Sequence, residues 1–136
     1  MKSLQDFLNE NNVEGMTKEV PISDRLRDEN GNLYKAKIKA MTSKEFGELR
    51  KSCTRINKKG KPEVDAEKLT NIIVIENTVV PNFKDAESIK KVGCLNAEQY
   101  INKVLLPGEI TVLNDEILLL SGFNSNMDDL IEEVKN

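Results

Sequence analysis

One apolar stretch, residues 105–123, constrains the fold more than any other part of this chain. Pro107 suits the first position of a helix, where its missing N–H costs nothing, and Gly122 suits the residue just after a helix. Between them, one stripe of apolar residues recurs at helical spacing: Ile110, Leu113, Ile117 and Leu120. The pattern therefore predicts a long amphipathic helix.

The same predicted helix carries a second apolar surface. At about 100° per residue, Val112 and Leu119 fall nearly opposite the first stripe, and Leu118 falls on a flank. One surface can pack on the body of the domain, but the other needs a second cover. That cover is either the chain's own tail or another protein, and the function depends largely on which one it is.

Composition excludes several kinds of chemistry. The 136 residues include no histidine, so Ser-His-Asp and Cys-His catalysis and His-ligated metal sites are excluded. Cys53 and Cys94 lie far apart without CxxC spacing, which argues against zinc and against a disulfide framework. Because phosphate-binding and nucleophile-elbow motifs are also missing, we predict a protein that is not an enzyme and uses no cofactor or metal.

Charge and hydropathy favour a protein of the cytoplasm. No run of about 18 apolar residues suggests a membrane span, and the first residues lack the apolar core of a secretory signal. The formal net charge is −3, so no global field attracts nucleic acid. The basic clusters are local, at Lys35, Lys37 and Lys39 and from Arg55 to Lys61. A solvated surface explains them better than a binding patch does.

A short helix and a β-hairpin are predicted in the first third of the chain. The capping pair Ser3 and Asp6 opens a helix that ends near Asn11. A hairpin follows over about 18–41. In it, a three-residue loop at 29–31 sets Ile22 opposite Ile38 and keeps the apolar residues on one side.

The remainder of the chain predicts helices with clear boundaries. A capping box opens a helix over about 42–53, and further caps precede helices that start near residues 65, 85 and 96. Residues 70–80 contain the β-branched run Ile72–Ile75, so a buried strand competes with the favoured helix there. The expected fold class is α+β and mostly helical, with one antiparallel β-hairpin packed against about five or six α-helices.

We expect residues 1–123 to form a single globular domain and residues 124–136 to form an acidic C-terminal tail. The tail has apolar residues at helical spacing, so it can fray, dock on the second surface of the long helix, or bind a partner. The candidate partner-binding residues are Val112, Leu118, Leu119, Leu130, Ile131 and Val134.

Five segments, in order along nearly the whole chain, resemble the XkdN-like family of phage tail assembly chaperones. The most specific are Leu-Arg-Lys-Ser-Cys-Thr at 49–54 and Leu-Leu-Pro-Gly-Glu at 105–109, at compatible spacing. The other three are residues 4–8, 27–31 and 121–123. The chain departs from the family at Asn-Leu-Tyr (32–34), where a stretch richer in Pro and Trp is expected. That departure concerns only the second strand of the hairpin.

The resemblance implies a non-catalytic helper that binds the phage tape-measure protein, keeps it soluble, helps recruit tail-tube subunits and is absent from the finished particle. Many such systems also make a longer form by ribosomal frameshifting, and Lys135-Asn136 is what a slippery A-rich heptamer encodes. Candidate partners are therefore the tape-measure protein, the tail-tube protein, a frameshifted longer form and a second copy of the chain. The alternative function is a nucleic-acid-binding phage or prophage regulator, which steep salt dependence of DNA binding would reveal.

Overall fold

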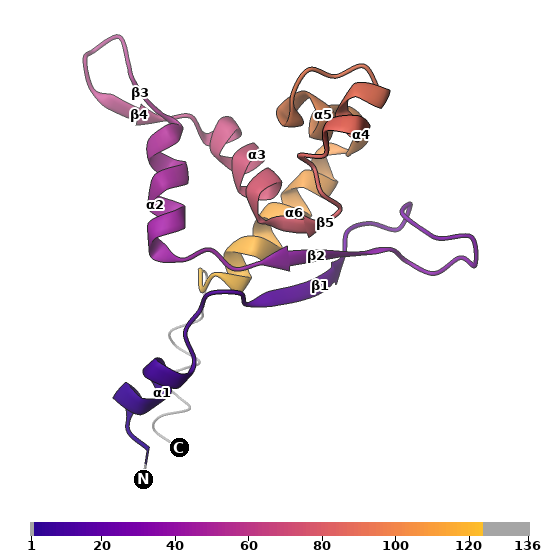
Figure 1. The fold of residues 1–136 in the computed structure, drawn as a ribbon. Helices are drawn as coiled ribbons and strands as arrows, with labels where there is room; N and C mark the ends of the chain where they lie inside the picture. Colours follow the sequence, from indigo (N-terminus) through magenta and orange to yellow (C-terminus); the bar gives the residue numbers. More distant parts are fainter. Residues whose placement is uncertain (1, 124–136) are drawn as a thin grey trace.

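The computed structural model describes residues 2–123, and the predicted class is confirmed: these residues form an α+β fold with six helices and a small antiparallel sheet (Figure 1). The helices are α1 (Leu4–Glu10), α2 (Ser43–Ser52), α3 (Ala66–Asn77), α4 (Ala86–Lys91), α5 (Ala97–Val104) and α6 (Pro107–Leu120). The strands are β1 (Thr17–Pro21), β2 (Lys35–Lys39), β3 (Thr54–Ile56), β4 (Pro62–Val64) and β5 (Thr78–Val80). No helix among residues 2–123 has the length and apolar character needed to cross a bilayer.

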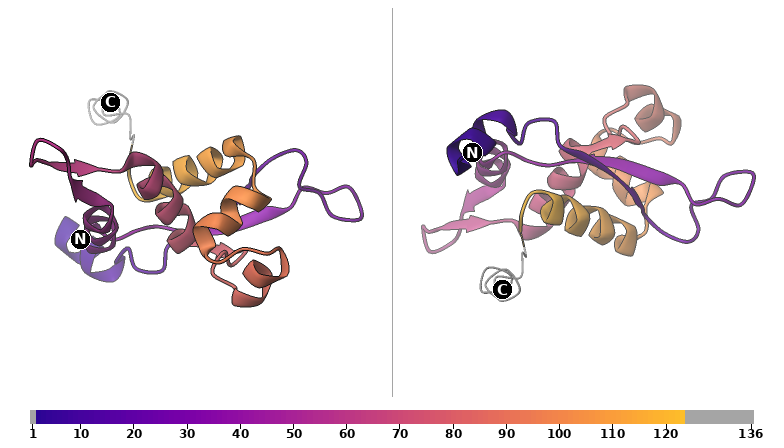
Figure 2. Two further views of the ribbon diagram at one scale, coloured as in Figure 1. Left: turned by 90° about the horizontal axis from the view of Figure 1, so that it is seen from above. Right: turned by 90° about the horizontal axis from the view of Figure 1, so that it is seen from below.

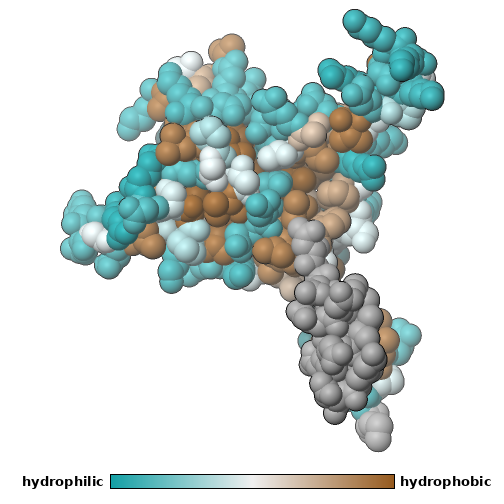
Figure 3. Space-filling view, turned by 180° about the vertical axis from the view of Figure 1, so that it is seen from behind, coloured by the Kyte–Doolittle hydropathy of each residue, from teal (hydrophilic) through white to brown (hydrophobic). Residues whose placement is uncertain are grey.

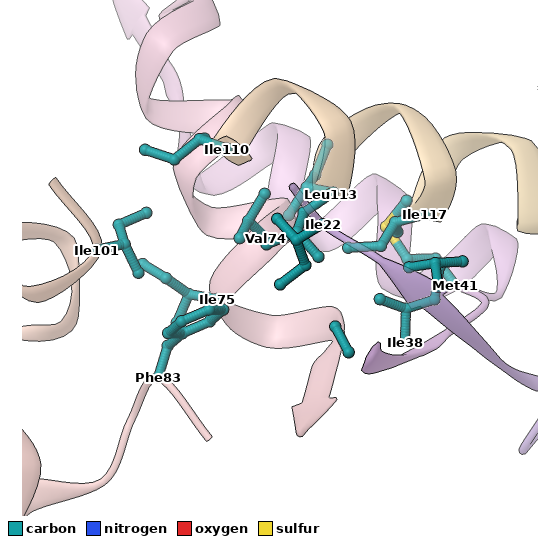
Figure 4. Packing of buried hydrophobic residues seen from close by; sticks show 13 residues of the cluster. Ile22, Ile38, Met41, Val74, Ile75, Phe83, Ile101, Ile110, Leu113 and Ile117 are labelled. Atoms are coloured by element: carbon teal, nitrogen blue, oxygen red, sulfur yellow. The ribbon is translucent and has the colours of Figure 1, made fainter. Parts of the chain in front are cut away.

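Helix α3 lies at the centre of the molecule. Figures 1 and 2 show α6 behind it, α2 to one side, and α4 and α5 to the other. The sheet, ordered β1-β2-β5, closes the core from below in the view of Figure 1. The side chains that meet between these layers are aliphatic and aromatic, and Figure 4 shows them from close by. The most deeply buried apolar side chains are Ile38, Val74, Phe83, Ile101, Leu113 and Ile117.

Local sequence sets most helix starts. Each of the first five helices begins with a polar N-cap whose side-chain oxygen accepts a hydrogen bond from the backbone N–H three residues later. The predicted capping boxes of Ser3 with Asp6 and of Thr42 with Glu45 are both present. The five N-cap residues are Ser3, Thr42, Asp65, Asp85 and Asn96.

The first hairpin confirms the predicted turn and corrects the register of the strands. Near the tip, the Gly31 amide donates to the Asp28 carbonyl at 3.1 Å, and Gly31 has a φ of 81°, as the three-residue loop requires. The strands themselves pair Lys18 with Ile38. The predicted pairing of Ile22 with Ile38 is therefore wrong. Pro21, which has no N–H for the ladder, ends β1, and the chain then leaves the sheet before it returns to the turn.

Residues 70–80 contain both a helix and a strand. The β-branched run 72–75 is helical within α3, as favoured, but the helix ends at Asn77 and residues 78–80 form β5 beside β2. Pro81 follows directly, and a residue before proline avoids the helical region, so the extended end of this segment has a local cause. Strands β3 and β4 form a second hairpin, whose turn spans residues 57–61.

Helix α1 stands away from the body of the molecule in Figure 1. None of its side chains is buried, and the apolar residues Leu4, Phe7 and Leu8 are all exposed. Its amphipathic pattern therefore has no apolar cover among residues 2–123.

Candidate partner-binding surface

Helix α6 presents two different faces, as the spacing of its apolar residues predicts. Ile110, Leu113 and Ile117 point into the core (Figure 4). On the other side, Val112 is 36% exposed and Leu119 is 51% exposed. We call these two side chains and their surroundings the outer face of α6. Viewed from behind in Figure 3, apolar atoms gather across the middle of the molecule, over this helix.

A buried carboxylate fixes the start of α6. The side chain of Glu109 is only 2% exposed, and its Oε1 accepts a hydrogen bond from the backbone amide of Leu106 at 2.7 Å. Arg25 donates to both carboxylate oxygens, at 2.7 and 2.8 Å, and also to the carbonyl of Val104 at 3.0 Å. The Ser23 hydroxyl donates to the same carboxylate. One side chain therefore joins the loop after β1 to the junction of α5 and α6.

The contacts of Glu109 also set its charge state. Burial raises the pKa of the carboxyl, but hydrogen bonds from Arg25, Ser23 and the Leu106 amide, together with the Arg25 charge, leave the pKa below its usual value. The pKa of Arg25 is raised, first by the hydrogen bond to Glu109. Both groups are thus charged at neutral pH, and their bidentate geometry is that of a structural ion pair.

A second set of contacts fixes the end of α6. Gly122 has a φ of 93°, and the amides of Gly122 and Phe123 donate to the carbonyls of Leu119 and Leu118, which is a Schellman motif. The Ser121 hydroxyl accepts from the Met41 amide at 2.9 Å. The Phe123 ring packs on Phe46 of α2, with centroids 5.0 Å apart. The chain therefore leaves α6 toward the first turn of α2.

The two anchors hold both ends of α6 in place. The outer face of the helix nevertheless remains exposed among residues 2–123. Leu118 is half-buried and packs against the core. Asp115 and Glu116 project from the turn between Val112 and Leu119, one on each side, and Glu116 lies 3.6 Å from Lys18 of β1. An apolar centre with a charged margin on a rigid helix is the usual anatomy of a protein-binding patch.

A separate apolar groove of about 360 Å³ runs beside β5 and α5. Its walls include Leu26, Tyr34, Val80, Phe83 and Tyr100, and Lys35 is its charged member. With one charged side chain, the groove lacks the paired acid and base groups that a catalytic site needs. Its apolar walls suit an apolar side chain of a partner. Among residues 2–123, no three Cys, Asp or Glu side chains gather to hold a metal ion.

The structure does not bring the basic clusters together. Lys35 and Lys37 are exposed on β2, whereas Lys39 pairs with Glu45 at 3.2 Å. The segment from Arg55 to Lys61 belongs to the β3–β4 hairpin, which lies at the opposite end of the molecule in Figure 1. No continuous basic stripe of the kind that follows a nucleic-acid backbone results.

Some of the candidate residues are placed and others are not. Val112 and Leu119 lie on the outer face of α6 with Leu118 at its flank, while Leu130, Ile131 and Val134 lie outside the described residues. Sequence reasoning missed the Glu109 anchor. The signal for its capping part was present, because Glu109 is the third residue of a helix that starts at Pro107. No comparable signal pointed to Arg25, which is 84 residues away in the chain.

Nearly the whole chain is similar to known proteins. A family model described as "Phage XkdN-like tail assembly chaperone protein, TAC" matches residues 4–135. "Uncharacterized protein YqbN" of Bacillus subtilis (strain 168) is 32% identical over 138 residues, which cover 98% of this chain and 93% of that protein. "Phage-like element PBSX protein XkdN" of the same strain is 29% identical with the same coverage. A crystal structure of the protein YqbN matches with a TM-score of 0.70 and 27% identity, over 91% of this chain and 99% of that chain.

Proposed function

Because the chain belongs to the XkdN-like family of phage tail assembly chaperones, we propose that it binds the tape-measure protein, keeps that protein soluble and helps to recruit tail-tube subunits. The role is non-catalytic and is carried out in the cytoplasm of the bacterial host. The chaperone leaves before the particle is complete. A longer form made by frameshifting, and a second copy of the chain, are further partners in this proposal.

The exposed outer face of α6 carries this proposal. A tape-measure protein is a long, largely helical chain with apolar stripes, and such stripes aggregate unless another surface covers them. Val112 and Leu119 offer two apolar side chains about two helical turns apart, on a helix whose own inner face is already buried. An amphipathic helix of the partner can lay its apolar side on such a surface.

Rigidity supports the choice of this surface. The Glu109 contacts fix the start of α6, and the Ser121 and Phe123 contacts fix its end. A surface that is ordered before binding loses less conformational entropy when the partner arrives. The charged margin, including Lys18 and Glu116, keeps the free protein soluble and limits the patch to its apolar centre.

Co-expression tests the proposed surface. We expect the wild-type chain to raise the soluble fraction of the tape-measure protein, and Val112→Asp combined with Leu119→Asp to abolish this effect. Two buried charges at the contact would then face apolar side chains of the partner without compensation. The matched control is Val13→Asp with Leu95→Asp, which changes two exposed aliphatic residues elsewhere, 51% and 87% exposed.

The unfolding midpoint of each variant in urea shows whether the fold survives. Loss of solubilisation in the α6 variant, with a wild-type midpoint and an active control, supports the surface. A folded α6 variant that still solubilises the tape-measure protein overturns it.

A further inference from the structure

The α2 helix and the β3–β4 hairpin form the basic part of an otherwise acidic chain. Residues 43–64 hold seven Lys and Arg side chains and three Glu side chains, a net charge of +4, whereas the whole chain has −3. We call residues 43–64 the basic arm. The arm projects from the body of the molecule at the upper left of Figure 1.

The tip of the basic arm is an open surface. Arg55, Lys58, Lys59 and Lys61 are all exposed, and none forms an ion pair with a carboxylate of residues 2–123. Among them, Ile56 is 68% exposed, and it lines a shallow hollow of about 590 Å³ whose charged members are the basic Arg55, Lys58 and Lys59 and the acidic Glu63. This combination suits a segment that is acidic and carries an apolar side chain.

The chain itself contains a segment of that chemistry, and it begins beside the arm. Residues 124–136 include Asp128, Asp129, Glu132 and Glu133 against one lysine, together with Leu130, Ile131 and Val134. They follow directly on Phe123, whose ring packs against Phe46 in the first turns of α2. The acidic segment therefore begins beside the base of the basic arm.

The segment is long enough to reach the tip. Its 13 residues span at most roughly 45 Å when fully extended. Helix α2 has 10 residues and is about 15 Å long. The three residues of β3 add about 10 Å to the tip of the hairpin. A short tether also gives an effective concentration on the order of millimolar, so weak contacts suffice for docking within one molecule.

We propose that residues 124–136 dock on the basic arm of the same chain, with the acidic side chains on the exposed lysines and an apolar side chain on Ile56. Two other exposed apolar surfaces carry carboxylates, which disfavour an acidic segment. The outer face of α6 is bordered by Asp115 and Glu116, and α1 carries Asp6 and Glu10. Docking on the arm also leaves Val112 and Leu119 uncovered, so this proposal does not depend on which partner α6 binds.

Amide chemical shifts of the full-length ¹⁵N-labelled chain test the docking. The test variant neutralises the segment with Asp128→Asn, Asp129→Asn, Glu132→Gln and Glu133→Gln. We expect the amides of residues 54–63 to move in this variant. Added NaCl should move the wild-type signals to the same positions, because salt screens exposed charges. The matched control neutralises four exposed carboxylates elsewhere: Glu14→Gln, Glu19→Gln, Glu29→Gln and Glu87→Gln. It should leave residues 54–63 unchanged.

A charge exchange separates docking from a change in the fold. Lys58→Glu, Lys59→Glu and Lys61→Glu should release the segment. Adding Asp128→Lys, Asp129→Lys, Glu132→Lys and Glu133→Lys to that variant should restore the shifts that residues 54–63 show in the docked wild type. Shifts confined to residues 111–119, or to no residue of 2–123, overturn the proposal. So do shifts at the arm that depend on protein concentration, which would place the segment on a second copy.

Discussion

Helices α6 and α1 are both amphipathic and both begin with a capping arrangement, yet the molecule uses them differently. One face of α6 is buried against α3 and the sheet, and contacts from distant parts of the chain hold both of its ends. Helix α1 has a complete capping box and no buried side chain. Periodicity therefore predicts a helix and its faces, whereas contacts distant in sequence decide whether an apolar face is buried in the core or stays exposed to a partner.

The largest difference should appear when a leucine is truncated in each helix. Leu113 is fully buried in α6, so Leu113→Ala should lower the free energy of unfolding by about 2–5 kcal/mol through lost burial and a cavity. Leu8→Ala in α1 is the matched control, and it should change stability by less than about 0.5 kcal/mol. Urea unfolding followed by circular dichroism measures both. Equal costs in the two helices would mean that α1 is buried in solution.

The anchor at the start of α6 should give the next largest effect. Replacing Glu109 by Gln removes a carboxylate that accepts four side-chain and backbone hydrogen bonds, and we expect a cost of about 1–3 kcal/mol at pH 7. The conservative control is Asp115→Asn, an exposed carboxylate on the same helix, which should cost less than about 0.5 kcal/mol.

The loss of stability caused by Glu109→Gln should also depend on pH, and it should be larger at neutral pH than at acidic pH. Its pKa is lower in the folded chain than in the unfolded chain, so the ionised form contributes stability above the unfolded pKa of about 4.3. This contribution is lost as the pH falls from there through the folded pKa. The stability gap between the wild type and Glu109→Gln should therefore be full at pH 7 and shrink on acidification below about pH 4. A gap independent of pH would contradict the ion-pair account.

The anchor at the end of α6 should give the smallest of these effects. Ser121→Ala removes the acceptor of the Met41 amide, and we expect a cost of about 0.5–1.5 kcal/mol. Thr111→Ala, which removes an exposed hydroxyl from the same helix, is the control and should cost less than about 0.5 kcal/mol. If both substitutions cost the same, Ser121 does not tie α6 to the start of α2.

Local signals in the sequence predicted much of the fold. Caps, proline and glycine located the helices, and the stripe through Leu113 identified the inner face of α6. The register of β1 and β2 was not predictable in this way. Alternation suggested that Ile22 lies in the ladder, but the chain leaves the sheet after Pro21 so that Ser23 and Arg25 reach Glu109. Pro21 gives the end of β1 a local cause, but the path that follows brings together residues more than 80 positions apart.

The candidate surface shows the same division. The helical spacing placed Val112 and Leu119 opposite the core, and both are exposed there. The caps at the two ends of α6 had local signals in Glu109 and Gly122, but their partners Arg25 and Met41 did not, because each lies about 80 positions away in the chain. Strand β5 was difficult to predict for a related reason. Residues 78–80 pair with β2, which is distant in sequence, instead of continuing α3.

Site-specific photo-crosslinking gives the most direct test of the claim that α6, and not α1, binds the tape-measure protein. A benzophenone amino acid replaces Leu119 in one variant and Leu8 in another, and each variant is co-expressed with the tape-measure protein. Both positions are more than half exposed, so the probe is equally accessible in the free chain. We predict a crosslinked product from position 119 and little or none from position 8. A product from position 8 alone would contradict the account.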